Sequence, residues 1–238
     1  MSAPRHLQAI IFDFDGVIAD SEPQHLRAFQ EALAGEDVAL DPADYYARYL
    51  GFDDVGLVRQ LAKDRGLAWS ERHVTALVAR KGAVLQRLLG AGSVLYPGAA
   101  DFVRRAAAAV PVAIASGALR HEIDEIAGAA GIRGLFAAVV ASGDTPDSKP
   151  SPAPYRLAYD RLCERTGRRL DPAKTVAIED SRWGLASARG AGLRCVGVTT
   201  SYPAHELPGA ELTAGGLADL TLDLLDALCA SRDAQGPR

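Results

Sequence analysis

Five short hydrophobic runs recur along the chain without regular alternation of polar residues. They are LQAIIF (7–12), VPVAIAS (110–116), FAAVVAS (136–142), TVAIED (175–180) and RCVGVTT (194–200). Runs of this length that lack polar alternation are typical of strands buried on both faces of a parallel sheet. We therefore predict five parallel strands.

Between these runs the hydrophobic spacing is that of amphipathic helices. The predicted helices cover residues 99–109, 121–131, 153–167 and 183–192. Alternation of strand and helix predicts an α/β fold whose parallel strands are joined by right-handed crossovers.

The first connection is longer than a crossover requires. A dozen or so residues suffice to join two parallel strands, yet the second strand is predicted only near residue 110. The surplus has helical patterns at 23–35, 42–51, 54–66 and 70–90, the last with Ser70 as its N-cap. We expect a helical cap domain over 20–93, inserted into an α/β core made of 1–19 and 94–238. The return hinge is expected at 93–98, and the last ten residues are expected to form a polar tail.

Composition excludes several classes of function. A net charge of −4 gives no general attraction to nucleic acid or to an anionic membrane. We expect no signal peptide, because MSAPRHLQAIIF (1–12) lacks a long apolar core, and no membrane helix, because no apolar stretch approaches the required length. The three cysteines, Cys163, Cys195 and Cys229, lack metal-binding spacing, which favours reduced thiols. We predict a cytoplasmic protein without nucleic-acid or membrane partners, a monomer with a dimer as the alternative.

Polar residues stand where the predicted strands end. The first strand runs into Asp13 and Asp15, and the next three lead to Ser116–Gly117, to Lys149 and to Glu179–Asp180. Ligands of open α/β sheets bind outside the carboxyl ends of the strands. We therefore expect these side chains to meet at one edge of the sheet.

Such a group of carboxylates needs a cation to neutralise it. Oxygen ligands in a partly open site suit Mg²⁺, which also accepts phosphate oxygens. One carboxylate can attack phosphorus to give an aspartyl phosphate, and a second can carry the proton of the leaving group. Ser116 with the neighbouring Gly117 N–H, and Lys149, can hold phosphoryl oxygens. The pattern predicts phosphoryl-transfer chemistry.

Four segments carry a family resemblance: DFDGV (13–17), IASG (114–117), SKPSPAPY (148–155) and IEDSRWGLASARGAG (178–192). They resemble the four ordered motifs of the haloacid dehalogenase superfamily, in the branch with β-phosphoglucomutase and related sugar-phosphate phosphatases. The resemblance covers nearly the whole chain. It implies a Rossmann-like parallel sheet core with an all-helical cap inserted after the first strand.

The resemblance also implies roles for the motif residues. Asp13 is implied as the nucleophile, and Asp15 as the general acid/base that lends its backbone carbonyl to the metal. Ser116 and Lys149 are implied to bind the transferring phosphoryl group. The implied metal-binding residues are Asp13, Asp15, Glu179 and Asp180.

The match is poorer in the cap. His25 stands where the mutase has a histidine that assists the acid/base aspartate, and Lys81 is matched to a lysine late in the mutase cap. The alternatives are a surface or half-buried side chain for His25 and a solvated helix face for Lys81. Asp53 and Asp54 stand where the mutase has an arginine for the substrate's distal phosphate. This difference favours a phosphatase over a mutase.

Arg120, shortly after Ser116, is a candidate for the missing positive charge at the substrate. The alternative is an ion pair with Glu122 or Asp124. The function we predict is a Mg²⁺-dependent phosphatase that acts on a small phosphorylated metabolite, a sugar phosphate, through an aspartyl phosphate. The alternatives are a β-phosphoglucomutase-type mutase and a non-catalytic protein that binds phosphorylated metabolites.

Overall fold

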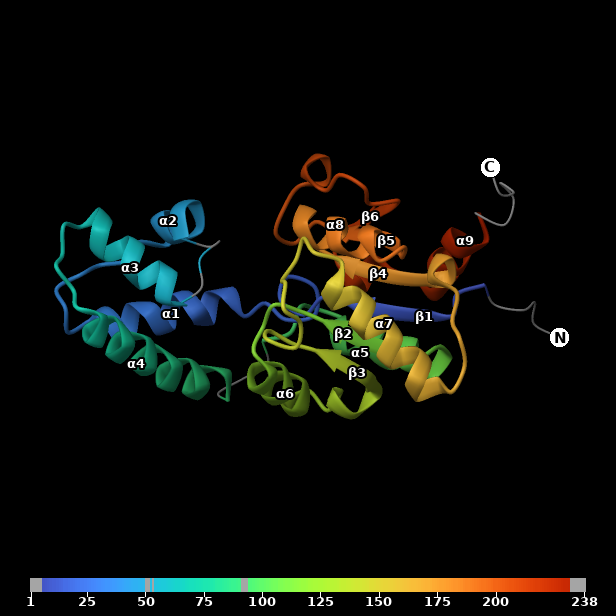
Figure 1. Ribbon diagram of the computed structural model, residues 1–238, viewed down its shortest axis with the longest axis horizontal. Coiled ribbons are helices and arrows are strands. Elements are labelled where there is room, and N and C mark those ends of the chain that lie inside the picture. The colour runs from blue at the N-terminus through green and yellow to red at the C-terminus, as the bar shows by residue number, and fades with distance from the viewer. Residues whose placement is uncertain (1–5, 50–51, 53, 91–93, 232–238) are drawn as a thin grey trace. The chain divides into compact units, whose positions relative to one another are not determined.

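The protein consists of two compact units in the computed structural model, which describes residues 6–49, 52, 54–90 and 94–231. The core unit comprises Met1–Asp20 and Ser93–Arg238, and the helical unit comprises Ser21–Gly92 (Figure 1). Each unit is described separately below.

A six-stranded parallel sheet forms the centre of the core unit. The strands are β1 (Ala9–Phe12), β2 (Val112–Ala115), β3 (Phe136–Val140), β4 (Thr175–Glu179), β5 (Arg194–Val198) and β6 (Leu212–Ala214). Their spatial order is β3-β2-β1-β4-β5-β6, so the first strand lies in the middle and pairs with both β2 and β4. The five predicted strands and the α/β class are confirmed. The strand β6 was not predicted from the sequence, since it has three residues and only partial burial.

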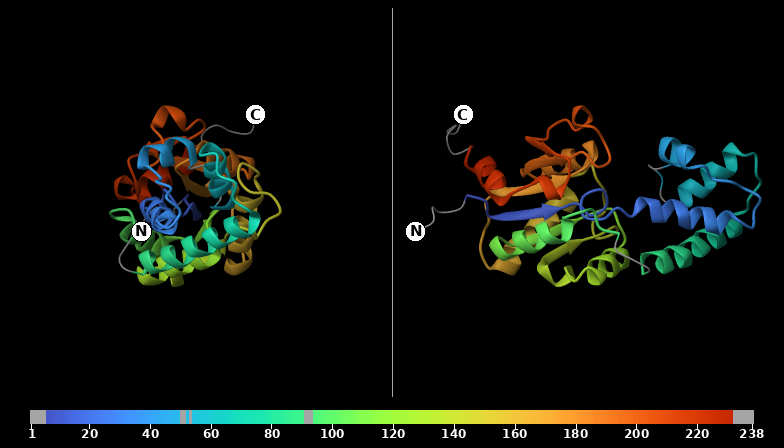
Figure 2. Two further views of the ribbon diagram at one scale, coloured as in Figure 1. Left: turned by 90° about the vertical axis from the view of Figure 1, so that its left-hand side faces the viewer. Right: turned by 180° about the vertical axis from the view of Figure 1, so that it is seen from behind.

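Helices cover both faces of the sheet. They are α5 (Ala99–Ala109), α6 (Arg120–Ala129), α7 (Ala153–Thr166), α8 (Arg182–Gly190) and α9 (Leu222–Ala230), with short 3₁₀ turns at Arg133–Leu135, Pro172–Lys174, Ala204–Glu206 and Leu217–Asp219. Helices α7 and α8 pack with Ile11 and Ala177 in one hydrophobic cluster. On the other face, the rings of Phe12 and Phe102 meet edge to face at 6.2 Å. Helix α7 lies in front of the sheet in Figure 1, and the view from behind in Figure 2 brings α5 forward.

The helical unit has a hydrophobic core of its own. Its elements are α1 (Glu22–Leu33), α2 (Pro42–Asp44), a π-helical turn (Tyr45–Tyr49), α3 (Asp54–Asp64) and α4 (Glu71–Leu89). Leu26, Phe29, Leu61 and Leu77 belong to its buried cluster. The Ser70 side chain accepts a hydrogen bond from the backbone N–H of His73, so the predicted N-cap of α4 is confirmed. The helix expected at 42–51 is instead a short helix followed by the π-helical turn.

The two chain segments that join the core to the helical unit are paired with each other. Ala19 and Leu95 form an antiparallel bridge. The Asp20 N–H donates to the Val94 carbonyl at 2.7 Å, and the Tyr96 N–H donates to the Ile18 carbonyl at 3.0 Å. The exit and the return of the chain therefore lie side by side, where the sequence analysis placed the return hinge.

The carboxyl-terminal part of the chain corrects one expectation. Residues from 229 onward were expected to be a polar tail, but α9 continues to Ala230 and Cys229 is buried. All three cysteines are free thiols, as expected. Among the described helices, none is long and apolar enough to span a membrane.

Candidate active site

The end of β1 places Asp13 beside the end of β4. The Asp13 N–H donates to the Ile178 carbonyl at 2.9 Å, which extends the β1–β4 pairing by one residue. Oδ1 of Asp13 accepts the Phe14 N–H at 2.7 Å. The chain then turns at Gly16, whose φ is +75°, and a Cβ atom there would lie 2.0 Å from Oδ2 of Asp180. Glycine is therefore required for this turn to pass so close to Asp180.

Glu179 ends β4 and is fully buried, with both carboxylate oxygens bonded by the protein. Oε1 accepts from the Lys149 ammonium at 2.6 Å and from the Tyr155 hydroxyl at 3.0 Å. Oε2 accepts from the Ser181 hydroxyl at 3.0 Å and from the Asp180 and Ser181 N–H groups at 3.1 and 3.2 Å. A carboxylate with this many donors has a fixed orientation.

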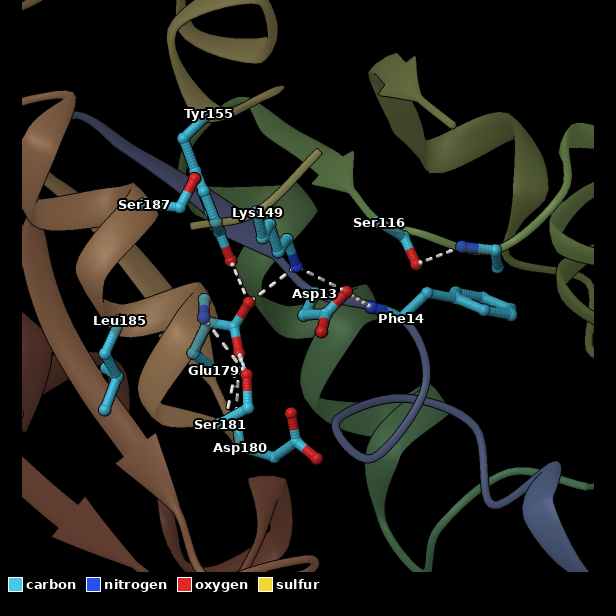
Figure 3. A network of polar contacts seen from close by, with 12 residues as sticks. Asp13, Phe14, Ser116, Lys149, Tyr155, Glu179, Asp180, Ser181, Leu185 and Ser187 are labelled. Atoms are coloured by element: carbon cyan, nitrogen blue, oxygen red, sulfur yellow. Dashed lines mark hydrogen bonds and ion pairs between the residues drawn. The ribbon is translucent and has the colours of Figure 1, made fainter. Parts of the chain in front are cut away.

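Lys149 links the two strand ends. Its ammonium lies 2.9 Å from Oδ1 of Asp13 and 2.6 Å from Oε1 of Glu179. Figure 3 shows the ammonium lying between the two carboxylates, with Tyr155 approaching Glu179 from the other side. The predicted convergence of β1, β4 and the Lys149 loop on one edge is therefore what the structure has.

The electrostatics of this cluster explain the pKa shifts of its members. Burial and the negative charge of Glu179 raise the pKa of Asp13 well above its ordinary value, against the opposing effect of Lys149. Burial alone would raise the pKa of Glu179, but the charge and hydrogen bond of Lys149 lower it. Burial, and then the charge of Glu179, raise the pKa of Asp180 to about 7. Two of the three carboxylates thus resist ionisation without a further cation.

The donor set fits a hard divalent cation. One oxygen each from Asp13, Glu179 and Asp180 lie within 4.8 Å of one another, in buried side chains. Among the ion pairs of the described residues, the Lys149 ammonium contacts two of these three carboxylates, Asp13 and Glu179. Oxygen donors with excess negative charge suit Mg²⁺. Asp15 is not in this carboxylate cluster, and its expected contribution was its backbone carbonyl; its side chain is half-buried.

Ser116 and Gly117 lie at the end of β2, in a cavity that Lys149 also lines. The cavity measures about 440 Å³, and Ser142, Thr145 and Ser148 add hydroxyl groups to its wall. Ser116 is buried, and its hydroxyl accepts the Ala118 N–H at 3.1 Å. The predicted phosphoryl-binding residues are therefore together in one cavity.

Arg120 has a different partner from either of those considered in the sequence analysis. Its guanidinium lies 2.7 Å from Oδ2 of Asp144 and donates to the Val139 carbonyl at 2.8 Å. Arg161 makes a second ion pair with the same Asp144 oxygen at 3.0 Å. The expected alternative, a pair with Glu122 or Asp124, is wrong. Arg120 holds the loop that follows β3.

The cap candidates His25 and Lys81 lie next to each other in the helical unit. The Lys81 ammonium lies 3.0 Å from Nδ1 of His25 and 2.8 and 2.9 Å from the two carboxylate oxygens of Asp54. The Lys81 side chain is 1% exposed, so the solvated alternative is wrong. Burial and the charge of Lys81 lower the pKa of His25 to about 4, so its imidazole is neutral near pH 7. Asp53 lies outside the described residues.

Sequence reasoning missed Tyr155, Ser181 and Gly184. Ser181 is the N-cap of α8, and its hydroxyl also donates to Glu179. A Cβ atom at Gly184 would lie 1.7 Å from Oε1 of Glu179. Tyr155 stands six residues after Lys149 in the same motif, which is the signal that was present.

A Rossmann-like parallel sheet with carboxylates, a lysine and a serine at its carboxyl edge, together with a helical insertion after the first strand, defines the class of this protein. The chain belongs to the haloacid dehalogenase-like hydrolase family, because residues 7–192 match the sequence profile of that family. The predicted superfamily is thereby confirmed.

The chain is also similar in sequence and structure to individual members of known function or structure. The chain is 35% identical over 230 residues to the plasmid form of protein CbbY of Cupriavidus necator, covering 90% of this chain and 87% of that protein. It is 26% identical over 202 residues to the phosphoglycolate phosphatase of Yersinia pseudotuberculosis, covering 82% of both. The crystal structure of a CbbY mutant from Rhodobacter sphaeroides, in complex with xylulose 1,5-bisphosphate, is similar with a TM-score of 0.76. That protein is 28% identical, and the match covers 90% of this chain and 96% of that one. The predicted enzyme class, a phosphoric monoester hydrolase, is confirmed at the level of the family.

Proposed function

We propose that this protein is a Mg²⁺-dependent phosphatase of a small phosphorylated sugar, working through an aspartyl phosphate on Asp13. The observation that carries the proposal is the contact of Lys149 with Asp13 beside the buried carboxylates of Glu179 and Asp180. The proposed nucleophile, the proposed phosphate-binding cation and the proposed metal ligands lie together in this cluster, which supports the proposal.

Asp13, Glu179 and Asp180 are the side chains proposed to hold Mg²⁺, with the backbone carbonyl of Asp15. When bound, Mg²⁺ would neutralise the negative charge of the carboxylates and of the phosphate that approaches them. This agrees with the raised pKa values of Asp13 and Asp180, since both carboxyl groups lack a sufficient counter-charge in the protein alone.

In the first step, a carboxylate oxygen of Asp13 attacks phosphorus, and the bond from phosphorus to the leaving oxygen breaks. Asp15, in its protonated form, donates its proton to that oxygen. Lys149 and the Phe14 N–H hold Oδ1 of Asp13, which fixes the plane of the attacking group. Ser116 and the Gly117 N–H are proposed to bind oxygens of the transferring phosphoryl group.

In the second step, Asp15 takes a proton from a water molecule, which attacks the phosphorus of the aspartyl phosphate. The bond from phosphorus to Asp13 breaks, and inorganic phosphate leaves. Asp15 regains its proton, so each turnover returns both carboxyl groups to their starting forms.

The helical unit is proposed to be the cap domain, and His25 is its proposed contact with the acid/base and substrate. Lys81 is proposed to act through His25, because its ammonium is buried against Asp54 and His25. Asp54 neutralises the cap lysine, so the cap offers less positive charge to a second phosphate. This contact favours hydrolysis over a mutase that must hold a sugar bisphosphate.

The substrate is proposed to be a sugar phosphate because relatives of this chain act on or bind small phosphorylated compounds. The compounds to test are sugar monophosphates, which need no positive charge for a second phosphate, and the xylulose 1,5-bisphosphate bound by the Rhodobacter sphaeroides CbbY mutant. We also propose a monomer, which light scattering coupled to size exclusion checks.

The test is phosphate release from a panel of sugar monophosphates and bisphosphates with Mg²⁺, with Asp13→Asn as the blank. We expect Asp13→Asn to lose turnover by a factor of about 10⁴ or more, as loss of a covalent nucleophile does, with an unchanged circular dichroism spectrum. A chelator should silence the wild type. Phosphate release that survives Asp13→Asn would overturn the mechanism. Glucose 1-phosphate that isomerises instead of losing phosphate would establish the mutase.

A further inference from the structure

Tyr155 is a fully buried polar residue that lies against the catalytic cluster. It sits in the first turn of α7, and its hydroxyl donates a hydrogen bond to Oε1 of Glu179 at 3.0 Å. Side chains of a helix lean toward its N-terminus, which here lies close to Lys149 in sequence. The local structure therefore directs the phenol toward the carboxyl edge of the sheet, as Figure 3 shows.

The same tyrosine also contacts Lys149. The Lys149 ammonium lies 5.1 Å from the centroid of the Tyr155 ring, within the range of a cation–π interaction. The ring thus borders the cation while the hydroxyl bonds the carboxylate that the cation contacts. One side chain restrains both members of the Lys149–Glu179 ion pair.

Tyr155 and Lys149 share one oxygen of Glu179, and their roles there differ. Lys149 must also be free to meet a phosphoryl group, because the proposed mechanism uses it at the substrate. The Tyr155 hydroxyl is not proposed to bind the phosphoryl group, because it is buried and donates to Glu179. The pKa of Tyr155 is raised well above its ordinary value by burial and by the charge of Glu179, so it remains a donor throughout the working range.

We propose that Tyr155 is a positioning residue, which fixes Glu179 for Mg²⁺ and keeps Lys149 in reach of Asp13 and the phosphoryl group. The inference rests on the proposed function, since it assigns Mg²⁺ to Glu179 and phosphate to Lys149. Tyr155 itself touches neither, and acts through these two side chains.

A purely packing role is the competing explanation, because Tyr155 belongs to the hydrophobic cluster that α7 and α8 form with the sheet. The Tyr155→Phe variant separates the two, because it removes one oxygen and retains the ring. Tyr159→Phe is a matched control, because Tyr159 lies one turn later on α7 and packs against the same hydrophobic cluster. Its hydroxyl donates to the Leu170 carbonyl and not to Glu179.

The experiment measures four quantities for both variants and the wild type. They are the Mg²⁺ dissociation constant by calorimetry, kcat and KM for the best sugar phosphate, and the melting temperature. Loss of a residue that orients a metal ligand weakens metal binding or activity by roughly 10- to 100-fold. We expect Tyr155→Phe to show a loss in this range in Mg²⁺ affinity and in kcat/KM, and Tyr159→Phe to stay within about twofold of the wild type.

A folded Tyr155→Phe whose Mg²⁺ affinity equals that of the wild type would overturn the proposal, whatever its melting temperature. The calorimetric measurement does not depend on turnover. If Tyr155→Phe weakens Mg²⁺ binding but the wild type releases no phosphate from any compound tested, the positioning role of Tyr155 stands and the proposed phosphatase function is wrong. A wild type that binds no Mg²⁺ would overturn both.

Discussion

Asp180 is the carboxyl group of the cluster with no ion pair to Lys149 among the contacts described above. Its pKa is raised from an ordinary value of 3.8 to about 7, because it is buried and lies near the charge of Glu179. Between these two values the folded protein retains a proton that the unfolded chain has lost. The contribution of Asp180 to stability is therefore fully present below pH 3.8 and is lost as pH rises through about 7.

This shift gives a prediction for pH dependence. We expect the metal-free protein to lose stability to urea as pH rises from about 5 to 8, and Mg²⁺ to bind more tightly over the same range, since a metal needs the ionised carboxylate. Urea titrations and calorimetry at several pH values check both trends. Asp180→Asn should flatten them, and an Mg²⁺ affinity that is independent of pH would contradict the assignment.

Residues of the site differ in how far the sequence could reveal them. Asp13, Ser116 and Glu179 could be found because each stands directly after a hydrophobic run, and parallel strands end at one edge. Tyr155 could not be assigned this way, because its partner Glu179 is 24 residues away and is met only in three dimensions. Arg120 was assigned to the substrate or to neighbours on its own helix, but its partner Asp144 lies on another loop.

At the scale of the elements, the start of α8 is built around the carboxylate that ends β4. Gly184 lies in the first turn of α8, and a Cβ atom there would lie 1.7 to 2.1 Å from the carboxyl atoms of Glu179. The absence of a side chain lets the helix begin directly over this carboxylate. Ser181 caps the helix through the Gly184 N–H at 3.1 Å and also bonds Glu179. The residues that begin α8 therefore also fix the position of the Glu179 carboxylate.

We therefore expect Gly184→Ala to destabilise the protein by about 1–3 kcal/mol, as overpacking does, and to weaken Mg²⁺ binding because Glu179 must move. Gly128→Ala in α6 is the matched control, since a Cβ atom there has no atom within 4 Å. Alanine in an open helical position should stabilise by roughly 0.5–1 kcal/mol. Urea unfolding and Mg²⁺ titration check both variants. Equal behaviour of the two would contradict the packing argument.

Long elements with strong hydrophobic patterns were predictable, and short or irregular ones were not. The helix α5 was predicted at its observed bounds because its buried face is regular. The three-residue strand β6 has no hydrophobic run, and its place depends on pairing with β5. The π-helical turn at Tyr45–Tyr49 continues the helical pattern of α2, so the sequence gives no sign of its wider hydrogen bonding.

At the scale of the whole molecule, each unit has its own hydrophobic cluster. Ile11 and Leu162 belong to the cluster of the core unit, and Phe29 and Leu61 to that of the helical unit. Within the core unit, backbone hydrogen bonds of Asp20 with Val94 and of Ile18 with Tyr96 join the segments that lead into and out of the helical unit. Among the described residues, neither cluster includes a residue of the other unit.

We predict that a core variant with residues 21–93 replaced by a short glycine-serine turn folds and binds Mg²⁺. The turn needs to span only the distance between paired backbones, because the Asp20 N–H and the Val94 carbonyl are 2.7 Å apart. Circular dichroism, a cooperative urea transition and Mg²⁺ calorimetry check this. A variant that is soluble but shows no cooperative transition would contradict the independence of the core.

The paired exit and return segments also bear on how such a protein can diversify. Because Ala19 and Leu95 are bridged, the chain segment that forms the helical unit begins and ends at neighbouring points in space. Recombination can exchange that segment as a cassette, and insertions or deletions within it need not disturb the strand order around Asp13. The helical unit can therefore change in sequence and size during evolution while the core unit around Asp13 keeps its strand order.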